Sequence, residues 1–172
     1  MDKLNTSKSL KKKFLILTIA FGFVTIGLKA QRADFSGIWI RNTDKCVTDA
    51  HLSINSIPIE FLIKQDNAHI EIGSISKNYM GDTTKYVEKL KFDGSPSTFI
   101  IKSNLKKKAS MQWALDQKGF METATYANDQ GDTLQSAKAL WTFAPDLKTL
   151  KIQWIVTVNG QNYEAIEVFD KK

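Results

Sequence analysis

The chain has little of the chemistry that most metal and redox sites need. Its 172 residues contain one cysteine and two histidines. A single cysteine excludes an internal disulfide, so Cys46 is expected to be a buried or half-buried free thiol or, alternatively, to pair with another chain. One cysteine and two histidines cannot form a closed zinc site without carboxylates, and no known ligand motif is present. The sequence therefore predicts no metal and no cofactor.

Recognisable catalytic patterns are also lacking. His51 lies in a long polar stretch and His69 begins an expected strand, and neither belongs to a Ser/His/Asp pattern with a nucleophile turn. Cys46 and His51 lie five residues apart in a loop, which is no signature of a thiol–imidazole pair. Asp129 and Asp132 are not followed by the terminal Glu of a calcium loop. No glycine-rich phosphate loop exists, and we expect no enzyme.

The chain begins with a basic and then apolar leader. Five lysines precede Phe14, an apolar run of about 15 residues reaches Leu28, and the small residue Ala30 follows. This order is typical of a secretory signal peptide. The run is shorter than the ~20 residues of a spanning helix, although an uncleaved membrane anchor is the alternative. The sequence predicts a helical signal peptide over residues 1–30 and an exported domain over 31–172, periplasmic or secreted, with no stable membrane span after cleavage.

Removing the leader also removes most of the net charge. Residues 1–30 hold six of the 24 Lys and Arg but one of the 18 Asp and Glu, which leaves 18 basic and 17 acidic residues. Nucleic-acid binding needs a basic face on the folded domain. The near-neutral balance predicts no nucleic-acid partner, and the sequence leaves the oligomeric state open.

The rest of the chain alternates apolar and polar residues in short runs separated by turns, and no segment holds a long helical stripe. Asn159-Gly160 predicts a type I′ hairpin, because these residues accommodate its two positive φ values. Met111, Trp113 and Leu115 are expected on one apolar face. Strands are expected over Phe35–Arg41, Ile59–Gln65, His69–Ile72, Thr83–Phe92, Ser97–Lys102, Ala109–Leu115, Phe120–Ala127, Ala137–Ala144, Leu150–Val158 and Tyr163–Asp170.

Strands joined to their sequence neighbours by short turns define the expected fold class. The sequence predicts an all-β protein, an antiparallel up-and-down β-barrel of about 8–10 strands, with a sandwich as the alternative. The polar stretch Asn42–Pro58 is expected to be either a binding loop or an ordered edge cover. Lys106-Lys107-Lys108 is either a patch for acidic polymers or lipid headgroups, or a solvated strand start that prevents edge pairing.

The segment Asp34-Phe35-Ser36-Gly37-Ile38-Trp39, with Asn42 and Lys45 after it, resembles the opening of small secreted bacterial lipocalin-like (calycin-type) β-barrel proteins. The segments Ala144–Leu150 and Val168–Lys172 are similar to the late hairpin and the ending of these proteins.

The resemblance implies a role for two residues. In lipocalins the Trp of Gly-x-Trp plugs the closed end of the barrel and the Gly lets backbone come close, which implies these roles for Trp39 and Gly37. Lipocalins often carry a Thr-Asp-Tyr motif mid-chain and a late Arg that stacks over the plug Trp. This chain contains no Thr-Asp-Tyr motif. It also has no late arginine, because its arginines after the leader are Arg32 and Arg41.

Candidate ligand contacts are the aromatic and acidic residues expected to point inward. In an open barrel the tryptophans would line an apolar pocket, and in a packed barrel they would form the core. Glu164 and Glu167 lie on opposite faces of the last strand, so one of them points inward and needs a partner or a ligand. The candidates are Trp113, Trp141, Trp154, Tyr126 and Glu167.

The sequence therefore predicts an exported, non-enzymatic binding protein that holds a small hydrophobic or amphipathic ligand in its barrel. The alternative is an envelope interaction module with a packed core, which binds a protein or glycan through its outer face or loops.

Overall fold

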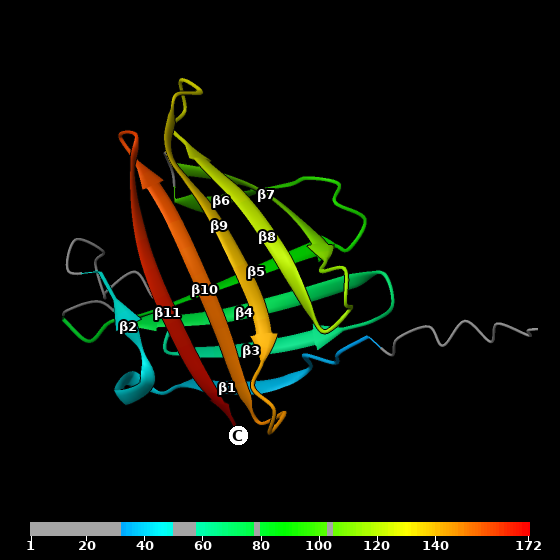
Figure 1. Cartoon of the computed structure of the whole chain (residues 1–172). Coiled ribbons are helices and arrows are strands. Elements are labelled where there is room, and N and C mark those ends of the chain that lie inside the picture. The colour runs from blue at the N-terminus through cyan, green and yellow to red at the C-terminus, as the bar shows by residue number, and fades with distance from the viewer. Residues whose placement is uncertain (1–31, 50–57, 78–79, 103–104) are drawn as a thin grey trace, which may run out of the picture.

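The computed structural model describes residues 32–49, 58–77, 80–102 and 105–172, and these form one antiparallel sheet. Its strand order is β5-β4-β3-β1-β11-β10-β9-β8-β7-β6, and the sheet bends into a nearly closed up-and-down barrel (Figure 1). The predicted fold class is therefore confirmed. The signal helix expected over 1–30 and His51 lie outside the described residues. No helix within these ranges is long and apolar enough to cross a membrane.

The strands follow the predicted alternation, but their ends differ. A short helix, η1 (Thr43–Lys45), and β2 lie within the long polar stretch, and β2 pairs with β11 beside β1. The strands are β1 (Gly37–Arg41), β2 (Val47–Thr48), β3 (Glu60–Gln65), β4 (His69–Lys77), β5 (Thr83–Lys91), β6 (Ser97–Lys102), β7 (Leu105–Trp113), β8 (Gly119–Ala127), β9 (Thr133–Phe143), β10 (Thr149–Val158) and β11 (Gln161–Lys171). β4, β9, β10 and β11 are longer than predicted, β1, β3 and β5 are one or two residues shorter, and β7 begins four residues earlier and ends two residues earlier.

Two turns can be compared with the sequence-based predictions, one after β10 and one after β7. Asn159 and Gly160 have φ values of 51° and 76°, which confirms the predicted hairpin between β10 and β11. The expectation that Leu115 shares the apolar face of Met111 and Trp113 is wrong. Strand β7 ends at Trp113, and Leu115 lies fully exposed in the turn that follows.

Aromatic rings fill one half of the barrel interior, which we call the aromatic half. Trp39 is fully buried, and its indole Nε1–H donates to the backbone oxygen of Phe35 at 2.8 Å. The Phe35 ring packs on those of Phe120 and Phe143, with centroids 4.6 and 4.3 Å apart. The ammonium of Lys171 lies 5.1 Å from the centroid of the Trp39 ring. A late lysine, not an arginine, thus places a cation over this indole.

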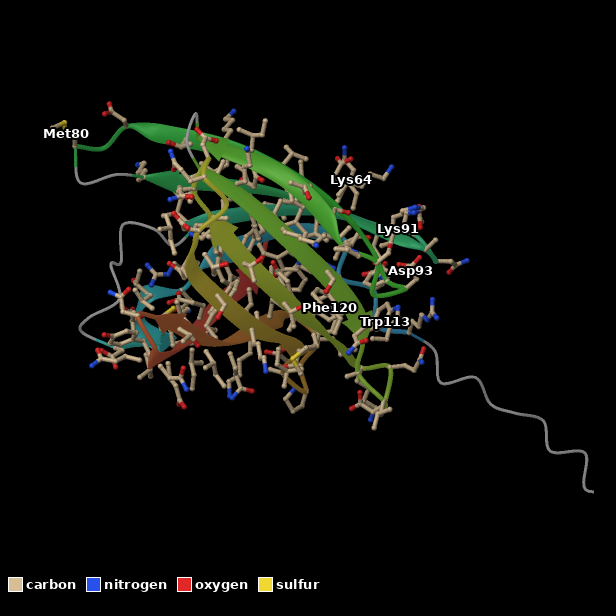
Figure 2. All side chains as sticks on the ribbon, turned by 90° about the horizontal axis from the view of Figure 1, so that it is seen from above. Lys64, Met80, Lys91, Asp93, Trp113 and Phe120 are labelled. Atoms are coloured by element: carbon tan, nitrogen blue, oxygen red, sulfur yellow. The ribbon has the colours of Figure 1, made fainter. Side chains whose placement is uncertain are left out.

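The barrel has a seam between β5 and β6, because no ladder of backbone hydrogen bonds joins these two strands. At the aromatic half the chain after β5 crosses to β7, where Asp93 forms a bridge with Gln112 and Gly94 N–H donates to Met111 O at 3.0 Å. Figure 2 shows Asp93 near Trp113 at this end of the seam. Further along, the contacts between described residues across the seam include the side-chain pairs Lys107–Glu88 and Tyr86–Phe99.

Gly37 yields a test of the packing at the aromatic half. Its φ is +138°, and an added Cβ would lie 2.8 Å from Lys171 Cε. We expect Gly37→Ala to lower the free energy of unfolding by roughly 2–3 kcal/mol, because it combines backbone strain with loss of the Lys171–Trp39 contact. Urea denaturation measures the change. Gly131→Ala is the matched control, since Gly131 has a φ of +90° and nothing within 4 Å of an added Cβ. Equal losses in the two variants would contradict a packing role for Gly37.

Candidate functional site

Three charged side chains meet inside the other half of the barrel, which we call the polar half. Lys107 on β7 donates to both carboxylate oxygens of Glu88 on β5, at 2.7 and 2.8 Å, and to Glu122 Oε1 on β8 at 2.8 Å. The side chains of Lys107, Glu88 and Glu122 are 7, 10 and 3% exposed. Trp141 Nε1–H donates to the remaining Glu122 oxygen at 3.2 Å. We call these three charged residues the Lys107 triad.

Local sequence explains how Lys107 reaches a carboxylate deeper in the barrel. Lys107 lies opposite Tyr126 in the β7–β8 ladder, whereas Glu122 lies four residues away from Tyr126 along β8. Ala109 and Ala124, an inward-facing pair between these two levels, carry only methyl groups. Their small size leaves a path for the lysine side chain. The expectation of a solvated lysine run is therefore wrong at Lys107, although Lys106 and Lys108 are exposed.

Burial and mutual attraction compete within the triad. Burial alone would lower the pKa of Lys107, but the carboxylate of Glu122, with Tyr126 and Glu88, outweighs this, so the pKa is raised and the lysine is cationic. Burial raises the pKa of Glu88, and the attraction of Lys107 offsets only part of that effect. With both carboxylates ionised the triad carries a net charge of −1.

Aromatic side chains surround the triad at the seam. Tyr86 on β5 packs edge-on against Phe99 on β6, with ring centroids 6.4 Å apart. The Tyr126 ring lies 5.8 Å from the Lys107 ammonium. The Tyr86 hydroxyl is buried and makes no hydrogen bond with the described chain. A buried hydroxyl without a partner is costly, which makes it a candidate ligand contact.

A second buried ion pair lies on the β1–β11 wall. Arg41 Nε donates to Glu167 Oε2 at 2.6 Å, and Thr48 Oγ1 donates to Glu167 Oε1 at 3.1 Å. Glu167 is the inward carboxylate, as one of the Glu164/Glu167 pair was expected to be, and the protein itself supplies its partners. Cys46 nearby is half-buried, as predicted, and burial raises the pKa of its thiol.

The structure divides the five candidate residues between the two halves of the interior. Trp113 and Trp141 pack on Phe120, at centroid distances of 6.1 and 5.2 Å, and belong to the aromatic half. Trp154 and Tyr126 face inward but stay half-buried toward the polar half. Glu167 is held by Arg41.

Sequence reasoning missed the triad and Tyr86. The available signal was a charged residue in the inward phase of a strand. Glu88 alternates with Tyr86 and Leu90, and Glu122 lies between Phe120 and Ala124. Within the described ranges no group of three or more His, Cys, Asp or Glu side chains could hold a metal ion.

No protein-family model, curated protein or solved structure matches the chain. Of the lipocalin-like resemblance, the structure supports a nearly closed antiparallel ten-stranded barrel path, to which β2 is added at β11.

Removing the cation of the triad tests its importance for stability. Lys107→Met leaves Glu88 and Glu122 buried without a counter-charge, so we expect a loss of about 3–5 kcal/mol in the free energy of unfolding. Lys108→Met, at an exposed position on the same strand, is expected to change it by less than about 0.5 kcal/mol. Urea denaturation measures both changes. If Lys107→Met does not fold, the triple variant K107M/E88Q/E122Q is expected to fold again. Equal effects of the two single changes would contradict the role of the triad.

The raised pKa of Glu88 predicts a pH dependence of stability. From the ordinary value of 4.5 up to the raised value, the folded protein holds a proton on Glu88 that the unfolded chain has lost. The stability contributed by Glu88 is therefore complete below pH 4.5 and is lost as the pH rises through this window. Glu88→Gln removes this contribution. We expect the free-energy difference between the wild type and E88Q, from urea denaturation at each pH, to move against the wild type as pH rises to neutrality. A difference that is constant with pH would contradict the assignment.

Proposed function

We propose that the protein is a non-catalytic carrier of a small amphipathic molecule, bound in the polar half of the barrel. The unpartnered hydroxyl of Tyr86 beside the Lys107 triad carries this proposal. The aromatic half is occupied by the protein's own rings. A ligand in the polar half would therefore lie next to the charged side chains of the Lys107 triad. Such a neighbour favours an amphipathic molecule over a purely apolar one.

Side chains on the walls of the polar half suit the apolar part of such a ligand. Trp154, Tyr126 and Phe99 face inward and remain half-buried. Ala137 and Ala165 place only methyl groups on the β9 and β11 walls. Half-buried aromatic rings beside small residues are a common lining of sites for small ligands.

The charge of the triad bears on the polar group of the ligand. When both carboxylates are ionised they exceed the one ammonium, and a carboxylate ligand would add to this negative charge in a poorly solvated place. The Tyr86 hydroxyl donates one hydrogen bond. A neutral or cationic polar group with a hydrogen-bond acceptor, such as the glycerol of a monoacylglycerol, meets both conditions.

Tyr86→Phe tests the proposal with two measurements that move in opposite directions. In the free protein the change removes an unsatisfied hydroxyl, so the free energy of unfolding is expected to rise by about 1 kcal/mol. For a monoacylglycerol, loss of one hydrogen bond is expected to raise Kd roughly fivefold. Urea denaturation measures the first effect and native mass spectrometry of the protein measures the second. The fatty acid of equal chain length is expected to bind more weakly than the monoacylglycerol.

Tyr163→Phe is the control, because the Tyr163 hydroxyl already donates to Gln161 Oε1, at 2.7 Å, at the start of β11. We expect it to leave the Kd unchanged. Absence of binding by monoacylglycerols, long-chain alcohols and long-chain amines alike would contradict the carrier function. Equal binding of the fatty acid would contradict the role given to the triad.

A further inference from the structure

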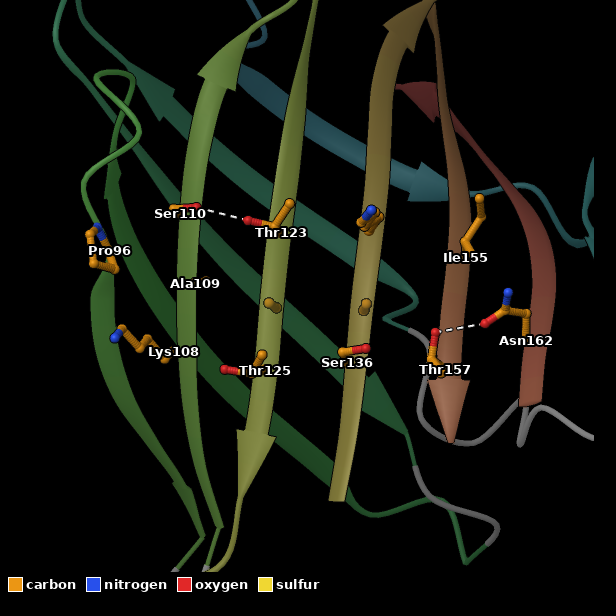
Figure 3. A pocket seen from close by; sticks show the side chains of 13 residues that line it. Pro96, Lys108, Ala109, Ser110, Thr123, Thr125, Ser136, Ile155, Thr157 and Asn162 are labelled. Carbon is orange, nitrogen blue, oxygen red and sulfur yellow. Dashed lines mark hydrogen bonds between the residues drawn. The ribbon is translucent and has the colours of Figure 1, made fainter. Parts of the chain in front are cut away.

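The outer face of the barrel carries a groove that is separate from the interior. It has a volume of about 570 Å³ and lies over β7, β8, β9 and β10, with Pro96 at one side and Asn162 of β11 at the other. Figure 3 shows the hydroxyl side chains that line it, on neighbouring strands: Ser110, Thr123, Thr125, Ser136 and Thr157. We call it the hydroxyl groove.

A straight row of polar side chains crosses the groove. The ladder registers place Lys108 opposite Thr125, Thr125 opposite Ser136, Ser136 opposite Thr157, and Thr157 opposite Asn162. Neighbouring strands lie about 4.8 Å apart, so the row extends over roughly 19 Å. The residues of the row are Lys108, Thr125, Ser136, Thr157 and Asn162.

The hydroxyls in the middle of this row are available to a ligand. Thr125 and Ser136 make no side-chain hydrogen bond with the described chain. At the end of the row Thr157 Oγ1 donates to Asn162 Oδ1 at 2.8 Å, which leaves the amide NH₂ of Asn162 as a donor. Each hydroxyl can donate one hydrogen bond and accept two, which is also the capacity of a sugar hydroxyl.

The groove carries positive charge without a compensating acid in its lining. Lys108 and Lys138 are both exposed, and neither forms an ion pair within the described part of the chain. The nearest carboxylate in the ladder, Glu164, lies opposite Ile155 on β11 and outside the lining. Ile155 is 44% exposed and offers an apolar contact for the C–H face of a sugar ring.

We propose that the hydroxyl groove binds an acidic oligosaccharide. Its hydroxyl row is spaced at the strand separation, which is close to the length that one pyranose adds to an extended chain. Lys108 and Lys138 pair with carboxylate or sulfate groups of the sugar. A peptide strand is the poorer occupant, because the groove lies on central strands whose backbone groups are already paired in the sheet.

Isothermal titration calorimetry of the protein tests the proposal with three probes. These are an oligogalacturonate, a neutral maltooligosaccharide of equal length and an oligoglutamate of equal charge. We expect the oligogalacturonate to bind most tightly and its affinity to fall as salt is added, because the lysines are exposed.

Groove variants then locate the contact. Thr125→Val and Thr157→Val remove hydroxyls while keeping side-chain shape and a residue that strands favour. Each is expected to weaken oligogalacturonate binding about 2–10-fold, and Lys138→Gln is expected to weaken it and reduce its salt dependence. Thr83→Val and Lys89→Gln, both on β5, are the controls, since both positions are exposed and lie outside the groove.

Three results would overturn the proposal: no binding of oligogalacturonate at millimolar concentration, equal binding of oligoglutamate, or affinities that the groove variants leave unchanged. Tyr86→Phe is expected to leave oligogalacturonate binding unchanged, so this site and the interior site succeed or fail separately.

Discussion

The ion pair between Lys107 and Glu88 is the interaction on which the shape of this barrel depends. Every other pair of neighbouring strands in the barrel path is joined by a backbone ladder, whereas β5 and β6 are not. Lys107 lies on β7 and reaches across this seam to Glu88 on β5, while it also binds Glu122 on β8. One ammonium thus connects both sides of the seam. Because all three groups are removed from water, an ionised group of the triad that lost its partner would be strongly destabilising.

Other features of the interior follow from placing a charge there. The methyl-sized residues Ala109 and Ala124 are needed beside the path of the Lys107 side chain. The indole Nε1–H of Trp141, which packs in the aromatic half, donates to the Glu122 oxygen that Lys107 does not bind. The result is an interior with two unlike halves, in which rings pack closely at one end and polar groups gather at the other. Such a division suits a ligand that is itself amphipathic.

Alternation and turn chemistry were enough to predict most of the strands and the hairpin at Asn159-Gly160, because these depend on residues close in sequence, whereas β2 and the first half of β7 were missed. The burial of Trp39 agrees with the plug role that the lipocalin resemblance implies. The triad forms only where three strands come together. In sequence, a lysine within a basic run such as 106–108 is most often solvated, so the pattern did not indicate that Lys107 is buried. Its burial becomes evident only when the registers place Glu88 and Glu122 within reach of it. The cation over Trp39 was missed for a similar reason, since Lys171 is polar, terminal and ordinary in sequence. The prediction for Leu115 was wrong because alternation does not show where a strand ends.

Charge separates the two proposed sites more sharply than their positions do. Glu88, Glu122 and Glu167 face inward against Lys107 and Arg41, so these two buried clusters of the described chain hold three acids and two bases. The hydroxyl groove has two lysines and no acid. With its carboxylates ionised, such a cluster carries a buried excess of negative charge that repels anions at low dielectric, whereas exposed lysines attract them over about one Debye length. Under the two proposals an anionic molecule binds the outer face and is opposed in the interior, and a neutral or cationic amphiphile has the reverse preference. One barrel wall, β7 to β10, can then present opposite selectivity on its two faces, because successive residues of a strand point to opposite sides.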